Sequence, residues 1–74
     1  MKATTLFHLC IAHGMTITID RQARRISRKG KPLLDVYLTP NSAFSFALRT
    51  DCVASARTTI HSVKECAAIL GVNR

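Results

Sequence analysis

The spacing of apolar residues changes twice along the chain, and each change predicts a different kind of element. The first stretch has its apolar or weakly polar positions at helical spacing: Leu6, Phe7, Leu9, Cys10, Ile11 and His13. Thr4 or Thr5 is expected to cap this helix. Gly14 suits the left-handed position that ends a helix, with Met15 as the hydrophobic contact that follows.

The middle of the chain has a two-residue period, which predicts four β-strands within residues 15–20, 23–28, 33–38 and 43–49. Turns are expected around Lys29–Gly30 and at residues 39–42. The side chains expected to face the core are Met15, Ile17, Ile19, Ile26, Leu34, Val36, Leu38, Phe44, Phe46 and Leu48. The side chains expected on the opposite, open face are Thr16, Thr18, Arg25, Ser27, Asp35, Tyr37, Ser45 and Arg49.

After Asp51 the apolar period returns to 3.6 residues, which predicts one long C-terminal helix. Its stripe consists of Val53, Ala56, Ile60, Val63, Ala67 and Leu70. Thr50 or Asp51 is the expected N-cap, and Gly71 is expected to end the helix. A helix of about 20 residues would be ~30 Å long.

The order of helix, four strands and helix predicts a single α+β domain spanning residues 1–74. Short turns favour a four-stranded antiparallel meander. The apolar faces of the strands and of both helices then meet in one core if both helices pack on the same face of the sheet. A domain this small has a marginal core, so a homodimer stays open as an alternative.

Charge adds a functional prediction to this fold. The net charge is +7, and six of the eleven lysines and arginines lie between residues 21 and 31. A net positive charge of this size favours a polyanionic partner. Lysine and arginine side chains gain affinity for nucleic acid by releasing its counterions. The expected contact residues, with two neighbours on the open face, are Arg21, Arg24, Arg25, Arg28, Lys29, Lys31, Tyr37 and Arg49. Because Tyr37 is the only aromatic residue expected on that face, duplex DNA is favoured over a single strand.

Two alternatives accompany this prediction. The same basic hairpin could dock on an acidic surface of a protein, or it could be a solvated hairpin that discourages aggregation between sheet edges. An enzyme is disfavoured, because Asp20 and Asp35 are expected on the first and third strands. The second strand would lie between these two carboxylates. Each of these two carboxylates should instead offset a neighbouring arginine.

No metal, cofactor or catalytic residue is expected either. The six residues that could supply nitrogen or sulfur ligands lack the spacings of known metal sites: His8, His13, His61, Cys10, Cys52 and Cys66. The odd number of cysteines favours free thiols in a reducing cytoplasm. His8 interrupts the short N-terminal apolar run, so neither a signal peptide nor a membrane span is expected.

Two stretches of the chain also resemble a known family. They are "RISRKGKPLLDVYL" and "ALRTDCVASAR", and they are similar to small accessory proteins of lambdoid prophages, in particular the Rac-prophage family associated with reduced chromosome breakage. The resemblance implies a cytoplasmic, non-enzymatic modulator of host DNA metabolism. Such a protein would act on DNA itself or on a host replication or repair protein.

Overall fold

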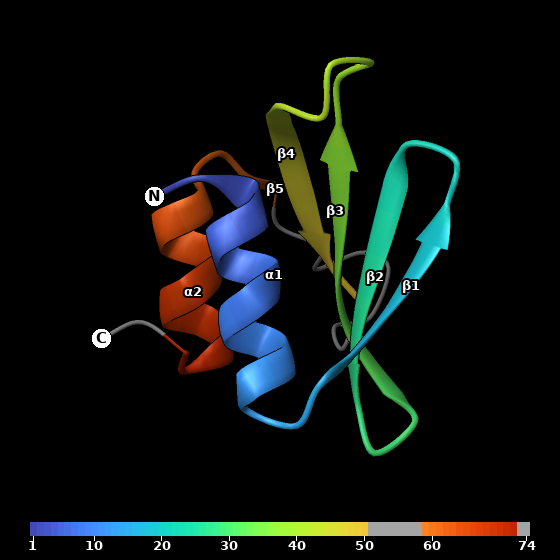
Figure 1. Cartoon of the computed structure of the whole chain (residues 1–74), viewed down its shortest axis with the longest axis vertical. Coiled ribbons are helices and arrows are strands. Elements are labelled where there is room, and N and C mark those ends of the chain that lie inside the picture. The colour runs from blue at the N-terminus through green and yellow to red at the C-terminus, as the bar shows by residue number, and fades with distance from the viewer. Residues whose placement is uncertain (51–58, 73–74) are drawn as a thin grey trace.

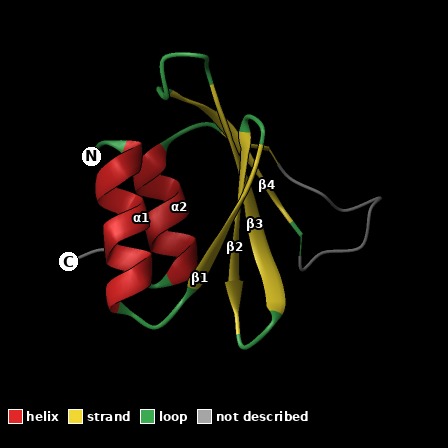
Figure 2. Ribbon diagram, turned by 45° about the vertical axis from the view of Figure 1, so that its right-hand side comes forward, coloured by secondary structure: helices red, strands yellow, loops and turns green. Residues whose placement is uncertain are grey.

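Both helices lie on one face of a single antiparallel sheet, and no described helix or strand covers the other face (Figures 1 and 2). The structure is a computed structural model that describes residues 1–50 and 59–72. Its elements follow the order α1 (Ala3–Ala12), β1 (Thr16–Asp20), β2 (Ala23–Arg28), β3 (Lys31–Leu38), β4 (Phe44–Arg49), β5 (Thr59–Ile60) and α2 (Val63–Leu70). The predicted α+β fold is confirmed.

The sheet is a meander in which each strand pairs with the next, in the order β1-β2-β3-β4-β5. All four pairings are antiparallel. The predicted meander is therefore right in its order, but the described part of the chain has five strands and not four. The additional strand is β5, which pairs with β4 through Ala47 opposite Ile60.

Helix α1 ends as its sequence predicts but begins earlier. Gly14 has a φ of +80°. Its N–H donates to Ile11 O (3.0 Å), and the Met15 N–H donates to Cys10 O (2.9 Å). These two bonds form a Schellman motif, which places Met15 in the core. The predicted cap at Thr4 or Thr5 is wrong, because both lie inside a helix that begins at Ala3.

The predicted 20-residue C-terminal helix is also wrong in its described portion. Ile60 belongs to β5, and α2 begins only at Val63. Ser62 is its N-cap, and Ser62 Oγ accepts a hydrogen bond from the Glu65 N–H (3.0 Å). The helix ends, as predicted, at Gly71, which has a φ of +72°. The rest of the predicted stripe, Val53 and Ala56, lies outside the described residues, as does the proposed cap Asp51.

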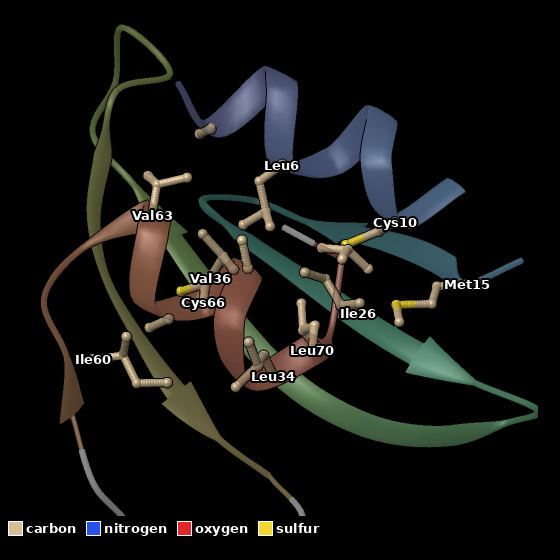
Figure 3. Close-up of a cluster of buried hydrophobic side chains, with 14 of the residues drawn as sticks. Leu6, Cys10, Met15, Ile26, Leu34, Val36, Ile60, Val63, Cys66 and Leu70 are labelled. Carbon is tan, nitrogen blue, oxygen red and sulfur yellow. The ribbon is translucent and has the colours of Figure 1, made fainter. Parts of the chain in front are cut away.

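The core lies between the two helices and the covered face of the sheet (Figure 3). Leu6 and Cys10 enter it from α1, and Cys66 and Leu70 enter it from α2. The fully buried side chains of the middle strands are those predicted from the two-residue period: Ile26, Leu34 and Val36. These three side chains pack β2 and β3 against both helices.

Strand β4 faces the opposite way from its prediction after Ser45, whereas Phe44 packs against the core as predicted. Ala47 is fully buried, whereas Phe46 is 36% exposed. The register explains the difference, because Leu38 lies opposite Phe44 while Tyr37 lies opposite Phe46. One residue between these pairs, Ser45, is therefore extra, and this β-bulge reverses the alternation that follows it.

Two further consequences of the register correct the sequence prediction. Leu48 lies opposite Asp35 and so belongs to the open face. Arg49, expected on the open face, lies opposite the buried Leu34 and so belongs to the helix side. Ile19 is on the helix side as predicted, opposite Arg24, but it is 69% exposed because β1 is an edge strand beyond the helices.

Candidate nucleic-acid interface

Five of the six basic residues of segment 21–31 are divided between the two ends of β2, and the sixth, Arg25, lies between them. Arg21 lies in the turn before β2, and the Arg24 guanidinium donates to Arg21 O at 2.6 Å. At the other end, Arg28, Lys29 and Lys31 lie around the turn into β3. We call these sets the β1–β2 group (Arg21 and Arg24) and the β2–β3 group (Arg28, Lys29 and Lys31).

The two groups are well separated, because the two turns are at opposite ends of β2 (Figure 1). Eight residue steps of extended chain join Arg21 to Lys29, which corresponds to roughly 27 Å. This distance is close to the longest dimension of the molecule, 29 Å. A cluster that is compact in sequence is therefore extended in space.

Both turns hold a basic residue in the left-handed region. Arg21 has a φ of +55°, and Lys29 has a φ of +52° followed by Gly30 at +80°. Two positive values in succession are typical of the type I′ hairpin turn, whose twist matches that of the strands. The predicted turn at Lys29–Gly30 is confirmed, and it leaves the Lys29 side chain exposed.

Arg25 lies between the two groups and is paired. Its Nε donates to Asp35 Oδ1 at 2.8 Å, and its Nη2 donates to Asp35 Oδ2 at 3.1 Å. These hydrogen bonds raise the pKa of Arg25. The expectation that Asp35 offsets a neighbouring arginine is thus confirmed, and Asp20 is separated from Asp35 by β2 as expected. A phosphate that approaches Arg25 must compete with this carboxylate.

Arg28 lies on the helix side of β2. Its Nη2 donates a long hydrogen bond, 3.5 Å, to Leu70 O near the end of α2. A cation at a helix C-terminus interacts favourably with the partial negative charge of the last carbonyl groups. Arg28 therefore connects the β2–β3 group to the end of α2, although its side chain is still exposed.

The open face carries an aromatic pair that the sequence reading missed. The rings of Tyr37 and Phe46 are stacked, with centroids 4.7 Å apart and planes 16° apart. Strict alternation through β4 predicts that Phe46 faces the core. Finding this pair from sequence would have required the bulge at Ser45, which no local residue pattern indicates.

Beside the aromatic pair, the open face is hollowed. A depression of about 220 Å³ is lined by Thr18, Asp20, Ala23, Arg25, Asp35 and Tyr37. A wider one of about 530 Å³ shares Asp20, Ala23 and Tyr37 with it and extends over Arg21 and Gln22 in the turn. Of the three residues that the two hollows share, Ala23 has the smallest side chain.

Of the predicted contact residues, Tyr37 and Arg25 are on the open face, the two cationic groups are at the ends of β2, and Arg49 is on the helix side. Within residues 1–50 and 59–72, no three histidine, cysteine or acidic side chains lie close enough to hold a metal ion. Neither of the two described helices has the length and hydropathy to cross a membrane.

Comparisons of the chain with protein-family models, with curated proteins and with solved structures found no significant match. The prophage resemblance therefore stays a prediction.

Proposed function

We propose that this protein binds nucleic acid, with duplex DNA as the favoured form, through phosphate contacts of the two cationic groups at the ends of β2. The observation that carries the proposal is the position of five basic residues at the two ends of one strand: Arg21, Arg24, Arg28, Lys29 and Lys31. The net charge of +7 supports the same class of partner.

The expected affinity is mainly electrostatic. Each phosphate that a cation neutralises releases counterions, so the logarithm of the binding constant falls with the logarithm of the salt concentration. Five contacts would give a slope of at most about −4.5 on duplex DNA. Arg25 adds little to this slope while it is paired with Asp35.

The biological setting is proposed from the resemblance alone. A prophage accessory protein of this kind would work in the cytoplasm without catalysing a reaction, and it would modulate host DNA metabolism. Its second candidate partner is an acidic surface on a host replication or repair protein.

The proposal is tested by fluorescence anisotropy with a labelled duplex of about 20 base pairs, titrated between about 50 and 200 mM salt. The informative variant is Arg21→Asn/Lys29→Asn, because asparagine tolerates the left-handed conformation of both positions. The matched control is Lys2→Gln/Lys64→Gln, which removes the same charge from two exposed positions, one just before α1 and one in α2.

We expect the Arg21→Asn/Lys29→Asn protein to lose about 1.8 from the magnitude of the slope, and the control to lose much less. No binding of the wild type at the lowest salt would refute the proposal. Equal losses in the two variants would show that net charge matters and that the ends of β2 do not. Either result would turn attention to the acidic protein partner.

A further inference from the structure

Four side chains lie in one row across the open face. Asp20 is opposite Ala23, Ala23 is opposite Tyr37, and Tyr37 is opposite Phe46. Residues directly opposite each other share a face, and neighbouring strands are ~4.8 Å apart. Tyr37 and Phe46 fill their two positions with stacked rings 4.7 Å apart. The next position in the row holds only the methyl group of Ala23.

The row therefore contains a slot one strand wide. Phe46 covers one face of the Tyr37 ring and lines neither hollow. Tyr37 lines both hollows above Ala23, with Asp20 on the far side. A flat ring placed over Ala23 would continue the aromatic stack at the spacing that Tyr37 and Phe46 already have.

We infer that this slot receives an unpaired base of a nucleic-acid strand, which stacks on Tyr37 above Ala23. The inference rests on the proposed function, because the cationic groups bring the strand to the sheet. Bases stack on exposed aromatic side chains of a sheet when they are splayed out of a helix. A base inside a duplex has both of its faces covered by its neighbours and cannot enter.

The charges around the slot favour a base over a phosphate. The Asp20 carboxylate borders the slot, and the Asp35 carboxylate borders it together with Arg25. Carboxylates repel phosphate but accept hydrogen bonds from the amino group of a base, as from N4 of cytosine. Arg21 lines the neighbouring hollow, where it can hold the phosphate attached to the bound base.

The charge of the protein also selects among occupants of this face. A second copy would bring another +7 against the first, whereas a nucleic-acid strand brings the opposite charge. We therefore expect the protein to bind a duplex with an unpaired base more tightly than a fully paired duplex.

The test compares two labelled duplexes with the same sequence, one fully paired and one with a single unpaired cytidine. The first readout is anisotropy at one salt concentration. The second readout is the fluorescence of Tyr37, which is the only tyrosine in a chain without tryptophan. A base stacked on this ring should quench its emission.

Ala23→Val fills the slot without changing charge, and valine suits a strand. Tyr37→Leu removes the ring and keeps an apolar side chain. The control is Thr16→Val, which lies on the open face opposite Ser27, away from the slot.

We expect the wild type and Thr16→Val to bind the duplex with the unpaired base roughly tenfold more tightly than the paired one. Ala23→Val and Tyr37→Leu should bind both duplexes with the affinity that the wild type has for the paired one. Tyr37 emission should fall only with the unpaired base, in the wild type and in Thr16→Val.

Three results would overturn the inference. Equal affinity of the wild type for the two duplexes would leave the proposed function in place but remove the base slot. Quenching by free cytidine monophosphate as strong as that by the duplex would assign the slot to a nucleotide and not to a strand. No binding of either duplex at low salt would overturn the slot together with the proposed function.

Discussion

Arg25 and Asp35 form a two-pronged ion pair across β2 and β3, with Nε–Oδ1 at 2.8 Å and Nη2–Oδ2 at 3.1 Å. The pair lies on the open face midway between the two cationic groups. The Arg25 side chain is 52% exposed and that of Asp35 is 14% exposed. The pair thus holds the Arg25 side chain in one geometry and offsets its charge.

Removing this carboxylate should strengthen nucleic-acid binding. Asp35→Asn raises the net charge from +7 to +8 and frees Arg25, so the magnitude of the salt slope should increase by up to about 0.9. The free energy of unfolding should fall only slightly, because the arginine is largely solvated. Anisotropy and urea unfolding measure the two effects. Glu65→Gln, with the same charge change on α2, should leave the slope nearly unchanged; a steeper slope for both would contradict the prediction.

Stability and binding should change in opposite directions at Lys29. Its φ of +52° is strained for lysine, whereas Asn-Gly is a favoured pair for this turn. Lys29→Asn should therefore raise the free energy of unfolding by a few tenths of a kcal/mol to about 1 kcal/mol, and duplex binding should weaken. Lys31→Gln is the control for charge, and it should weaken binding without stabilising the fold. A destabilised Lys29→Asn protein would refute the interpretation of the turn.

The start of α2 should depend on one hydroxyl group. Ser62 Oγ accepts the hydrogen bond of the Glu65 N–H, so Ser62→Ala should lower the free energy of unfolding by about 1 kcal/mol. Ser62→Asp retains an acceptor at the same position and should cost much less. Thermal unfolding followed by circular dichroism compares the variants. The cap is unimportant if the alanine and aspartate variants unfold at the same temperature.

Alkaline pH should destabilise the fold through its two buried thiols. Burial raises the pKa of Cys10 and of Cys66 to about 11 each, from 9.0. The folded state therefore holds these protons more tightly than the unfolded state. This contribution to stability is complete below about pH 9 and is lost as the pH rises from 9 to 11.

Urea unfolding between pH 8 and pH 11 measures this decline. In Cys10→Ala/Cys66→Ala the total stability should be lower, because two buried side chains are truncated, but its decline over this pH range should be shallower. The difference between the two proteins is the relevant quantity, because all other groups are common to both. Parallel declines would show that the thiols do not cause the loss.

The parts of the fold that the sequence predicted are those whose signals are local. Gly14 and Gly71 end their helices because each adopts a positive φ, and Ile26, Leu34 and Val36 follow a clean alternation on central strands. The alternation failed in β4 because the bulge at Ser45 is set by pairing with β3, not by neighbouring residues.

The C-terminal error had a different origin. Ile60, Val63, Ala67 and Leu70 are three or four residues apart, so a two-residue strand followed by a helix reproduced a helical stripe. The pattern Ser62-x-x-Glu65 is a capping signal that was present in the sequence and could have placed the start of α2 correctly.

The candidate site was predictable in composition but not in arrangement. The six basic residues are evident from the sequence. Their distribution in space depends on the path of the strands and on the two turns at the ends of β2. Tyr37 was placed correctly on the open face. Its partner Phe46 could not be, because the pair exists only through the register between β3 and β4.

The separation of the two cationic groups sets a minimum footprint on DNA bound along β2. Phosphates advance ~3.4 Å per step along a strand, so roughly 27 Å corresponds to about eight base pairs. A duplex shorter than this can reach only one group at a time, and its affinity should drop abruptly with length. The length of β2, which packing against the helices maintains, would thus determine the shortest nucleic acid that the protein holds with both ends.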